Sequence, residues 1–188
     1  FADELSAYAY DEINGKLELN KIQRFDSKGS SKQFFGFSSN YIFLLEKTVR
    51  ILGPSGNFIR DFNFGSPVTC ATICSTITAM EGIIVGLEDG QVIQIFVHHR
   101  FSHVIFKHDA PIRSISISQL KSKIAVVDDK HRCCVYGTMS GRLLFIEEGI
   151  NTVCWNELND NLLAMSDDEN VYIKAFEMQR VKTTMKGE

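Results

Sequence analysis

Three histidines near the middle of the chain are the first residues whose spacing suggests chemistry. His98 and His99 are adjacent and His103 follows shortly after, and imidazoles this close in sequence can chelate zinc. Neighbouring residues on a strand face opposite ways, however, and no cysteine or carboxylate lies close enough in sequence to complete four ligands. We therefore interpret His98 and His99 as part of a solvated turn, with His103 on the next strand, and predict no metal site.

The cysteines are the second candidate group, and they are Cys70, Cys74, Cys133, Cys134 and Cys154. Cys70 and Cys74 would share one face of a strand at ~13 Å, and Cys133 and Cys134 would face opposite ways, so neither pair can hold an ion. An odd number of cysteines without a visible signal peptide argues against a disulfide framework. We expect free thiols in a reducing compartment, used as small apolar core residues.

Acidic residues recur in three places: Glu88-Asp89-Gly90, Asp128-Asp129 and Asp167-Asp168-Glu169. If these places are equivalent in successive repeats, they are too far apart for their oxygens to converge on one calcium ion. Asp and Asn favour turns, and Asp-Gly suits a two-residue hairpin loop. We predict that these residues form turns along one rim, with a modest electrostatic influence on partner choice.

Other signatures of catalysis are absent from the sequence. It contains no G-x-S-x-G, Walker or dinucleotide fingerprint, and Gly53-Pro54-Ser55-Gly56 is interpreted as a tight turn between strands. We therefore predict no catalytic residue, no cofactor-binding residue, no metal-ligating residue and no cofactor.

The acidic turns mark an internal repeat of about forty residues. Each follows a short apolar run, and these runs are Ile83 to Leu87, Ile124 to Val127 and Leu162 to Met165. Asp89 and Asp129 are 40 residues apart, and Asp129 and Asp168 are 39 residues apart. A fourth copy runs from Tyr41 to Leu45, turns at Glu46-Lys47 and continues from Thr48 to Leu52.

Side-chain alternation indicates what each repeat contains. Arg113 to Ser118 alternates with period two, so Ile115 and Ile117 face one way and the serines the other, as in a half-buried strand. The apolar run of Ile124 to Val127 predicts a strand covered on both faces. A further strand follows a second turn, for example Gly141 to Ile146. Four antiparallel strands per forty residues predict an all-β fold, a β-propeller of four-stranded blades.

We expect residues 1–188 to form a partial WD-repeat-like propeller of about four and a half blades. Residues 1–25 would end a preceding blade, with a turn at Asn14-Gly15, and the successive blades would span 33–62, 68–107, 112–148 and 151–183. Seven blades of ~40 residues need roughly 280 residues, so the remaining blades are expected elsewhere in a longer protein.

Composition limits the function classes. Of 188 residues, 44% are hydrophobic and 23% charged, as in an ordinary globular domain, and a net charge of -3 gives no sign of a polybasic nucleic-acid binder. No run reaches the ~18 to 20 apolar residues of a membrane helix. We therefore expect no nucleic-acid partner, no direct insertion into a membrane and no small-molecule substrate.

The repeats resemble degenerate WD repeats. Lys107 to Ile112 sits where such proteins place their Gly-His element, but the closing Trp-Asp is replaced by Phe96-Val97, Tyr136-Gly137 and Ala175-Phe176. Residues 82–176 resemble, in order and spacing, the second propeller of the 122-kDa-type WD-repeat subunits of intraflagellar transport complex A. The matching segments include Gly82 to Val97, Lys123 to Asp128, Val153 to Asn156 and Val171 to Ala175.

This resemblance implies two amino-terminal propellers followed by a helical solenoid, and a non-catalytic scaffold that serves retrograde transport and the entry of cargo into the cilium. It implies as partners the other subunits of complex A and cargo adaptors, and as location the cytoplasm, the cilium or flagellum and its base. The residues leave two alternatives open: a propeller of a vesicle coat, or a propeller enzyme such as a glycosidase with paired carboxylates in its channel.

Trp155 is expected on the first strand of a blade. Alternation places Val153 and Trp155 on one face and Cys154 on the other, and packing between neighbouring blades should cover both faces. We expect the indole N–H to be bonded to a backbone carbonyl or to water.

Overall fold

The computed structural model describes residues 4–13, 16–26, 33–37, 40–74 and 82–176, the first two ranges as backbone only, and every regular element in them is a β-strand. The chain divides into two compact units, Phe1–Ile112 and Arg113–Glu188, each of which is described by itself. Within the described part of the chain, no helix is long and apolar enough to cross a membrane.

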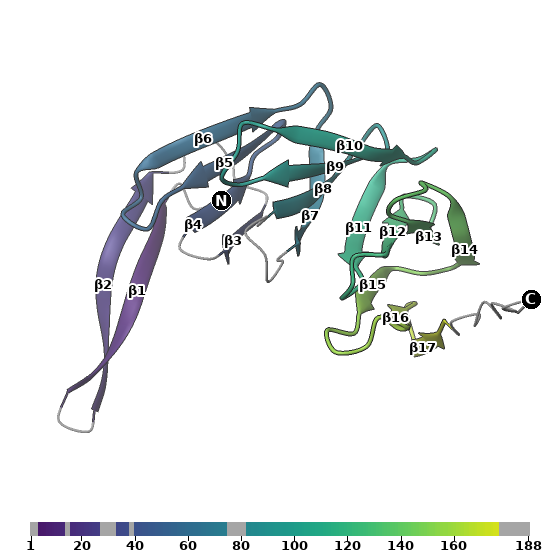
Figure 1. Cartoon of the computed structure of the whole chain (residues 1–188). Helices are drawn as coiled ribbons and strands as arrows, with labels where there is room; N and C mark the ends of the chain where they lie inside the picture. Colours follow the sequence, from purple (N-terminus) through teal and green to yellow (C-terminus); the bar gives the residue numbers. More distant parts are fainter. Residues whose placement is uncertain (1–3, 14–15, 27–32, 38–39, 75–81, 177–188) are drawn as a thin grey trace, which may run out of the picture. The chain divides into compact units, whose positions relative to one another are not determined.

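The first unit contains a hairpin and two four-stranded sheets (Figure 1). The hairpin pairs β1 (Glu4–Ile13) with β2 (Lys16–Asp26). The next sheet has β3 (Gln33–Phe37), β4 (Asn40–Leu44), β5 (Thr48–Leu52) and β6 (Phe58–Asn63) in that order. The sheet after it has β7 (Val68–Cys74), β8 (Gly82–Leu87), β9 (Gln91–Phe96) and β10 (Ser102–Lys107).

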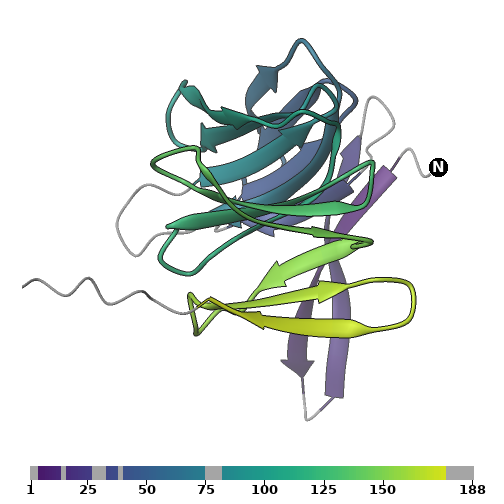
Figure 2. The same ribbon diagram turned by 90° about the vertical axis from the view of Figure 1, so that its right-hand side faces the viewer.

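The second unit contains two sheets, which Figure 2 shows one on the other. The four-stranded sheet has β11 (Ile112–Ile117), β12 (Lys123–Asp128), β13 (Arg132–Gly137) and β14 (Leu143–Glu148). The three-stranded sheet has β15 (Thr152–Trp155), β16 (Leu162–Ser166) and β17 (Val171–Ala175).

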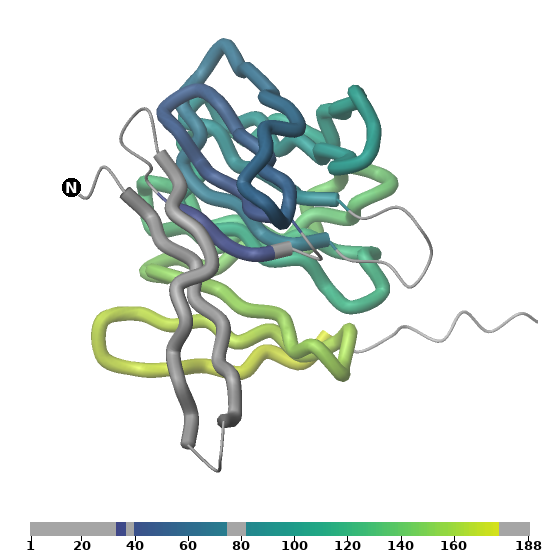
Figure 3. Tube along the Cα trace, turned by 90° about the vertical axis from the view of Figure 1, so that its left-hand side faces the viewer, coloured from purple at the N-terminus to yellow at the C-terminus, as the bar shows by residue number. Residues whose placement is uncertain are grey.

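All these sheets are antiparallel meanders, in which every strand pairs with its neighbours in sequence; Figure 3 shows the chain completing one sheet before it begins the next. The predicted all-β fold of four-stranded repeats is confirmed. The last sheet has three strands in the described residues, and the end of its expected range, 177–183, lies outside them. The expected turn at Asn14-Gly15 also lies outside the described residues.

Burial follows the predicted patterning of the strands. Every residue of β8 is buried, and β12 is buried from Ile124 to Asp128, as expected for continuous apolar runs covered on both faces. In β11, Ile112 and Ile115 are buried and Arg113 is exposed, while Ile117 is only half-buried. Strands in the middle of each sheet therefore supply most of the core.

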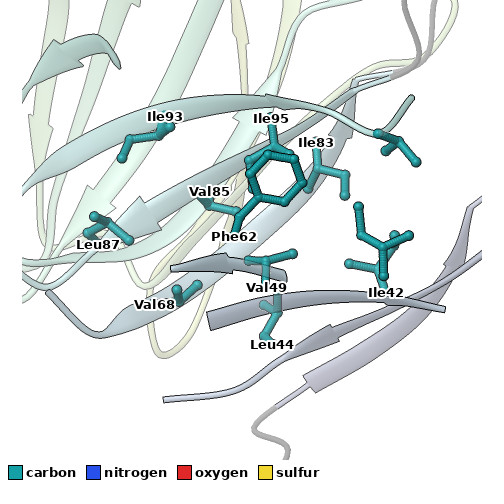
Figure 4. Packing of buried hydrophobic residues seen from close by; sticks show 12 residues of the cluster. Ile42, Leu44, Val49, Phe62, Val68, Ile83, Val85, Leu87, Ile93 and Ile95 are labelled. Carbon is teal, nitrogen blue, oxygen red and sulfur yellow. The ribbon is translucent and has the colours of Figure 1, made fainter. Parts of the chain in front are cut away.

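The core of the first unit lies between its two four-stranded sheets. The sheet of β3 to β6 contributes Ile42, Leu44, Val49, Ile51 and Phe62, and the sheet of β7 to β10 contributes Ile83, Val85, Leu87, Ile93 and Ile95. Figure 4 shows this cluster from close by. Most of these side chains are 0–1% exposed. Burying an aliphatic side chain of this size stabilises the folded state by about 1.5–3 kcal/mol, so this core fixes how the two sheets stack.

A recurring backbone hydrogen bond joins the segment that follows the last strand of each four-stranded sheet to the turn between the second and third strands of that sheet. The N–H of Val68 donates to the carbonyl of Glu46, that of His108 to Gly90, and that of Ile150 to His131, each over 2.8 Å. Gly90 has φ +84°, and a Cβ added there would overlap the carbonyl oxygen of His108. The Asp-Gly turn therefore needs glycine for two reasons, its positive φ and this close approach.

Candidate interaction surfaces

The predicted turn role of the acidic residues is confirmed. Asp89, Asp129 and Asp168 all lie in turns between the second and third strands of their sheets. The carboxylate that accepts backbone hydrogen bonds differs, however: Asp89 accepts from Gln91, Asp128 from Lys130 and Arg132, and Asp167 from Glu169 and Asn170. In the first turn the acceptor is thus the second acidic residue, whereas in the other two turns it is the first. Each of these carboxylates accepts from the N–H two residues ahead.

The turn acceptors differ in burial. Asp128 is completely buried, and its charge is compensated by Arg132, whose Nη2 lies 2.7 Å from Oδ2. Asp167 also accepts a 2.6 Å hydrogen bond from the hydroxyl of Tyr172. This bond and the N–H groups of Glu169 and Asn170 lower the pKa of Asp167 to about 2, and the same carboxylate raises the pKa of Tyr172. These carboxylates are engaged in holding turns.

The histidines occupy the positions that alternation predicts. His98 and His99 lie in the exposed turn after β9, and His103 lies on β10, opposite Gln94. All three side chains are exposed. The solvated-turn interpretation of His98 and His99 is confirmed, and the prediction that the segment holds no metal stays a prediction.

Four of the five cysteines are core residues, as predicted. Cys70, Cys74, Cys133 and Cys134 are buried free thiols. Burial raises the pKa of the Cys70 thiol to about 11 and that of Cys133 to about 12, so at neutral pH both are protonated and poorly nucleophilic. For Cys154 the prediction is wrong, because its side chain is exposed.

Trp155 is buried, as predicted, within the core between the two sheets of the second unit. It is 3% exposed and shares a cluster with Ala125, Val135, Val153 and Leu163. Its ring lies 5.4 Å from that of Phe176, and its backbone N–H donates to Ser116 Oγ over 2.9 Å. The Lys123 ammonium lies 5.6 Å from the Trp155 ring centroid, within the range of a cation–π interaction. Trp155 thus contacts Ser116 of β11, Lys123 of β12 and Phe176, which directly follows β17.

The structure corrects two expectations about the Trp155 strand. The indole nitrogen is buried, and no backbone carbonyl among the described residues accepts a hydrogen bond from it, so a bond to water stays a prediction. The face that carries Cys154 is not covered, contrary to expectation. Cys154 pairs with Ala164, and Ala164 with Ile173, which is 66% exposed. The side chains of Cys154 and Ile173 on this face of the three-stranded sheet are therefore exposed.

Many of the exposed apolar side chains lie on the last described strand of each sheet or next to it. These are Phe58 and Ile59 in β6, Phe101 and Val104 at β10, Leu143, Leu144 and Ile146 in β14, and Val171 and Ile173 in β17, whereas Phe34, Ile73, Leu120 and Leu158 lie elsewhere. Exposed apolar residues near charged ones are typical of surfaces that bind other proteins. Sequence reasoning assigned no role to these residues; the mixed apolar and charged run from Phe58 to Phe62 was the available signal.

A protein family and several of its members match the sequence of this chain. The family described as the IFT122 second beta-propeller matches residues 1–188. The intraflagellar transport protein 122 homolog of Mus musculus is 32% identical over 138 residues, which cover 73% of this chain and 12% of that protein. The Homo sapiens homolog is 33% identical over 138 residues, covering 73% of this chain and 11% of its own length. The matched region therefore spans about an eighth of these relatives.

Solved structures share the fold at low sequence identity. The Myceliophteria thermophila Cps50 (Swd1) beta-propeller domain superposes with a TM-score of 0.65 at 14% identity, over 81% of this chain and 55% of that one. The computationally designed Ika4 protein superposes with a TM-score of 0.63 at 14% identity, over 80% of this chain and 93% of that one. These likenesses support a propeller fold.

Proposed function

Because the chain belongs to the IFT122 second beta-propeller family, we propose that it is a non-catalytic scaffold segment of an intraflagellar transport complex. In this proposal the complex is complex A, and the protein acts in retrograde transport and in the entry of cargo into the cilium. Its partners are the other subunits of that complex and cargo adaptors, and it works in the cytoplasm and at the cilium and its base. The family match over the whole chain is the observation that carries the proposal.

The architecture supports a scaffold in physical terms. The inner strands are buried and hold sheets together, whereas the outer strands present apolar and charged side chains to solvent. Rigid surfaces of this kind bind partners by shape and charge complementarity, and they need no reacting group. The buried thiols with raised pKa values and the turn-forming carboxylates serve the fold itself.

The test replaces the endogenous full-length protein in ciliated cells with variants carrying substitutions in this segment. Trp155→Ala, which removes the centre of an inter-sheet core, is expected to reduce co-purification of the other transport subunits and to leave cargo accumulated in cilia. Trp155→Phe is the matched control and should retain both. Normal transport with the segment deleted would overturn the proposal, and hydrolysis of a glycoside by the purified protein would favour an enzyme instead.

A further inference from the structure

We propose that a groove beside β6 binds an acidic segment of a partner protein, in which carboxylates lie next to apolar side chains. The groove has a volume of about 390 Å³ and is lined by Phe58, Ile59, Arg60, Asp61, Phe62 and Arg100. All six residues belong to the first unit. The inference rests on the proposed scaffold function and deepens it by naming the chemistry of one partner.

The charge of the groove is unbalanced. Asp61 is already neutralised by Arg50, whose Nε and Nη2 donate to its two carboxylate oxygens over 2.9 and 2.8 Å. This bidentate pair also raises the pKa of Arg50. Arg60 and Arg100 remain, and no acidic side chain among the described residues pairs with either of them. Two uncompensated guanidinium groups in one groove favour a ligand with negative charge.

Arg60 carries a donor that lacks an acceptor. It lies opposite Ile51 in the sheet, and its guanidinium is 5.9 Å from the ring centroid of Phe62, a residue of the core. Nη1 of Arg60 is buried and has no hydrogen-bond partner within the described part of the chain. A buried donor without an acceptor is costly, so a carboxylate placed in the groove would relieve that cost and form a charge-assisted bond.

The apolar walls indicate that the ligand is more than a small anion. Phe58 is 62% exposed and Ile59 is 37% exposed; outside the lining, Phe101 follows Arg100 in sequence and is 56% exposed. An inorganic anion would satisfy the arginines and leave these side chains in water. Phenylalanine and arginine are both enriched at protein interfaces relative to the rest of the surface. A peptide segment that alternates acidic and apolar residues satisfies both parts of the groove.

The outer edge of β6 adds a way to hold such a segment. In the order β3-β4-β5-β6, β6 has a strand on one side only among the described residues. Its pairing with β5 shifts register between Ile51 and Leu52, which lie opposite Arg60 and Phe58, so a bulge marks this edge. An extended segment alongside β6 would place its carboxylates at Arg60 and Arg100 and its apolar side chains on Phe58 and Ile59.

The experiment measures binding of a labelled peptide to the full-length protein by fluorescence anisotropy. The probe is fluorescein-Gly-Glu-Leu-Glu-Phe-Asp-Leu-Gly, and its counterpart has Gln and Asn in place of Glu and Asp. The acidic peptide is expected to bind more tightly than the amide peptide and to weaken as salt is added. Arg60→Gln and Arg100→Gln should each raise the Kd roughly tenfold, the loss of one charge-assisted bond. Arg142→Gln is the matched control, an exposed arginine in the turn before β14, and should leave the Kd unchanged.

Three outcomes would overturn the groove proposal. The amide peptide binds as tightly as the acidic one, the Arg60 and Arg100 variants bind as well as Arg142→Gln, or phosphatidylserine vesicles bind through these arginines and the peptide does not. Entry of the wild-type protein into the transport complex is measured in parallel. If the protein enters the complex but does not bind the peptide, the groove proposal alone is overturned. If it binds the peptide but does not enter the complex, the proposed scaffold function alone is overturned.

Discussion

The carboxylate of Asp160 accepts a 2.8 Å hydrogen bond from the ammonium group of Lys123, although the two residues belong to different sheets of the second unit. Asp160 lies in the turn between β15 and β16, and Lys123 begins β12. The same carboxylate accepts from the backbone N–H of Leu120 and from the hydroxyl of Ser122. Asp160 therefore joins the turn of one sheet to the equivalent turn of the other, beside the buried ring of Trp155.

Asp160→Asn is expected to loosen these two turns. The substitution keeps the size of the side chain but removes the charge to which Lys123, Leu120 and Ser122 donate hydrogen bonds, which should lower the local opening free energy by about 1–2 kcal/mol. Hydrogen exchange of residues 118–124 and 156–163 in the full-length protein measures the change. Glu157→Gln is the control, an exposed carboxylate in the same turn. Equal protection in the two variants would contradict the assignment.

The Asp160 contribution should depend on pH. Burial by itself would raise its pKa, but the hydrogen bonds from Lys123, Leu120 and Ser122 lower the pKa from 3.8 to about 2. Since the folded pKa is depressed, the stabilisation is complete above pH about 4 and is lost as the pH falls toward 2. The difference in opening free energy between wild type and Asp160→Asn should be constant from pH 7 to 5 and shrink below pH 4. A difference that grows on acidification would disprove the ionised pair.

Trp155→Ala should cost about 3–5 kcal/mol of local stability, because it leaves a cavity between two sheets. Trp155→Phe should cost less than half as much, since the indole N–H that it removes makes no hydrogen bond with the described residues. Hydrogen exchange of β12 and β15 in the full-length protein reports both costs. Unchanged protection together with loss of one binding partner would instead identify Trp155 as a recognition residue.

Gly90→Ala should destabilise the sheet of β7 to β10 by about 2 kcal/mol or more. An alanine there has to adopt a positive φ of 84°, and its Cβ would lie too close to the carbonyl oxygens of His108 and Ala110. Gly149→Ala separates the two effects, because Gly149 has φ +77° with no atom within 4 Å of the added Cβ. We expect Gly149→Ala to cost about 1 kcal/mol. If the two substitutions raised the hydrogen-exchange rates near their turns by the same factor, the contact with His108 would contribute little.

Alkylation should distinguish the cysteines. With N-ethylmaleimide at pH 7.5, Cys154 should react first because it is exposed, whereas burial and raised pKa values should slow Cys70 and Cys133 at least a hundredfold, roughly the ratio set by two pKa units. Peptide mass spectrometry over a time course gives the order. Cys154→Ser serves as the control and should abolish the fast phase. Early labelling of Cys133 would show that its core opens readily.

The sequence by itself determined the repeat and its strands. Alternation and turn chemistry act over a few residues, so the apolar run from Ile124 to Val127 and the acidic turn after it predict a buried strand and a tight bend wherever they occur. The spacing of Asp89, Asp129 and Asp168 then gave the length of the repeat, and the sheets that hold Asp89 and Asp129 have the predicted four strands. The same local signals placed His98 and His99 in a turn and Trp155 in the core.

Tertiary structure decided which faces are covered and which charges meet. Cys133 and Cys154 both lie on strands among apolar neighbours, yet the side chain of Cys133 lies in the core between two sheets and that of Cys154 is exposed. Lys123 and Asp160, or Arg60 and Arg100, come together only because separate turns and strands are stacked. Strand alternation specifies two faces but not what packs on each, and an ion pair depends on a distance in space that spacing along the chain does not set.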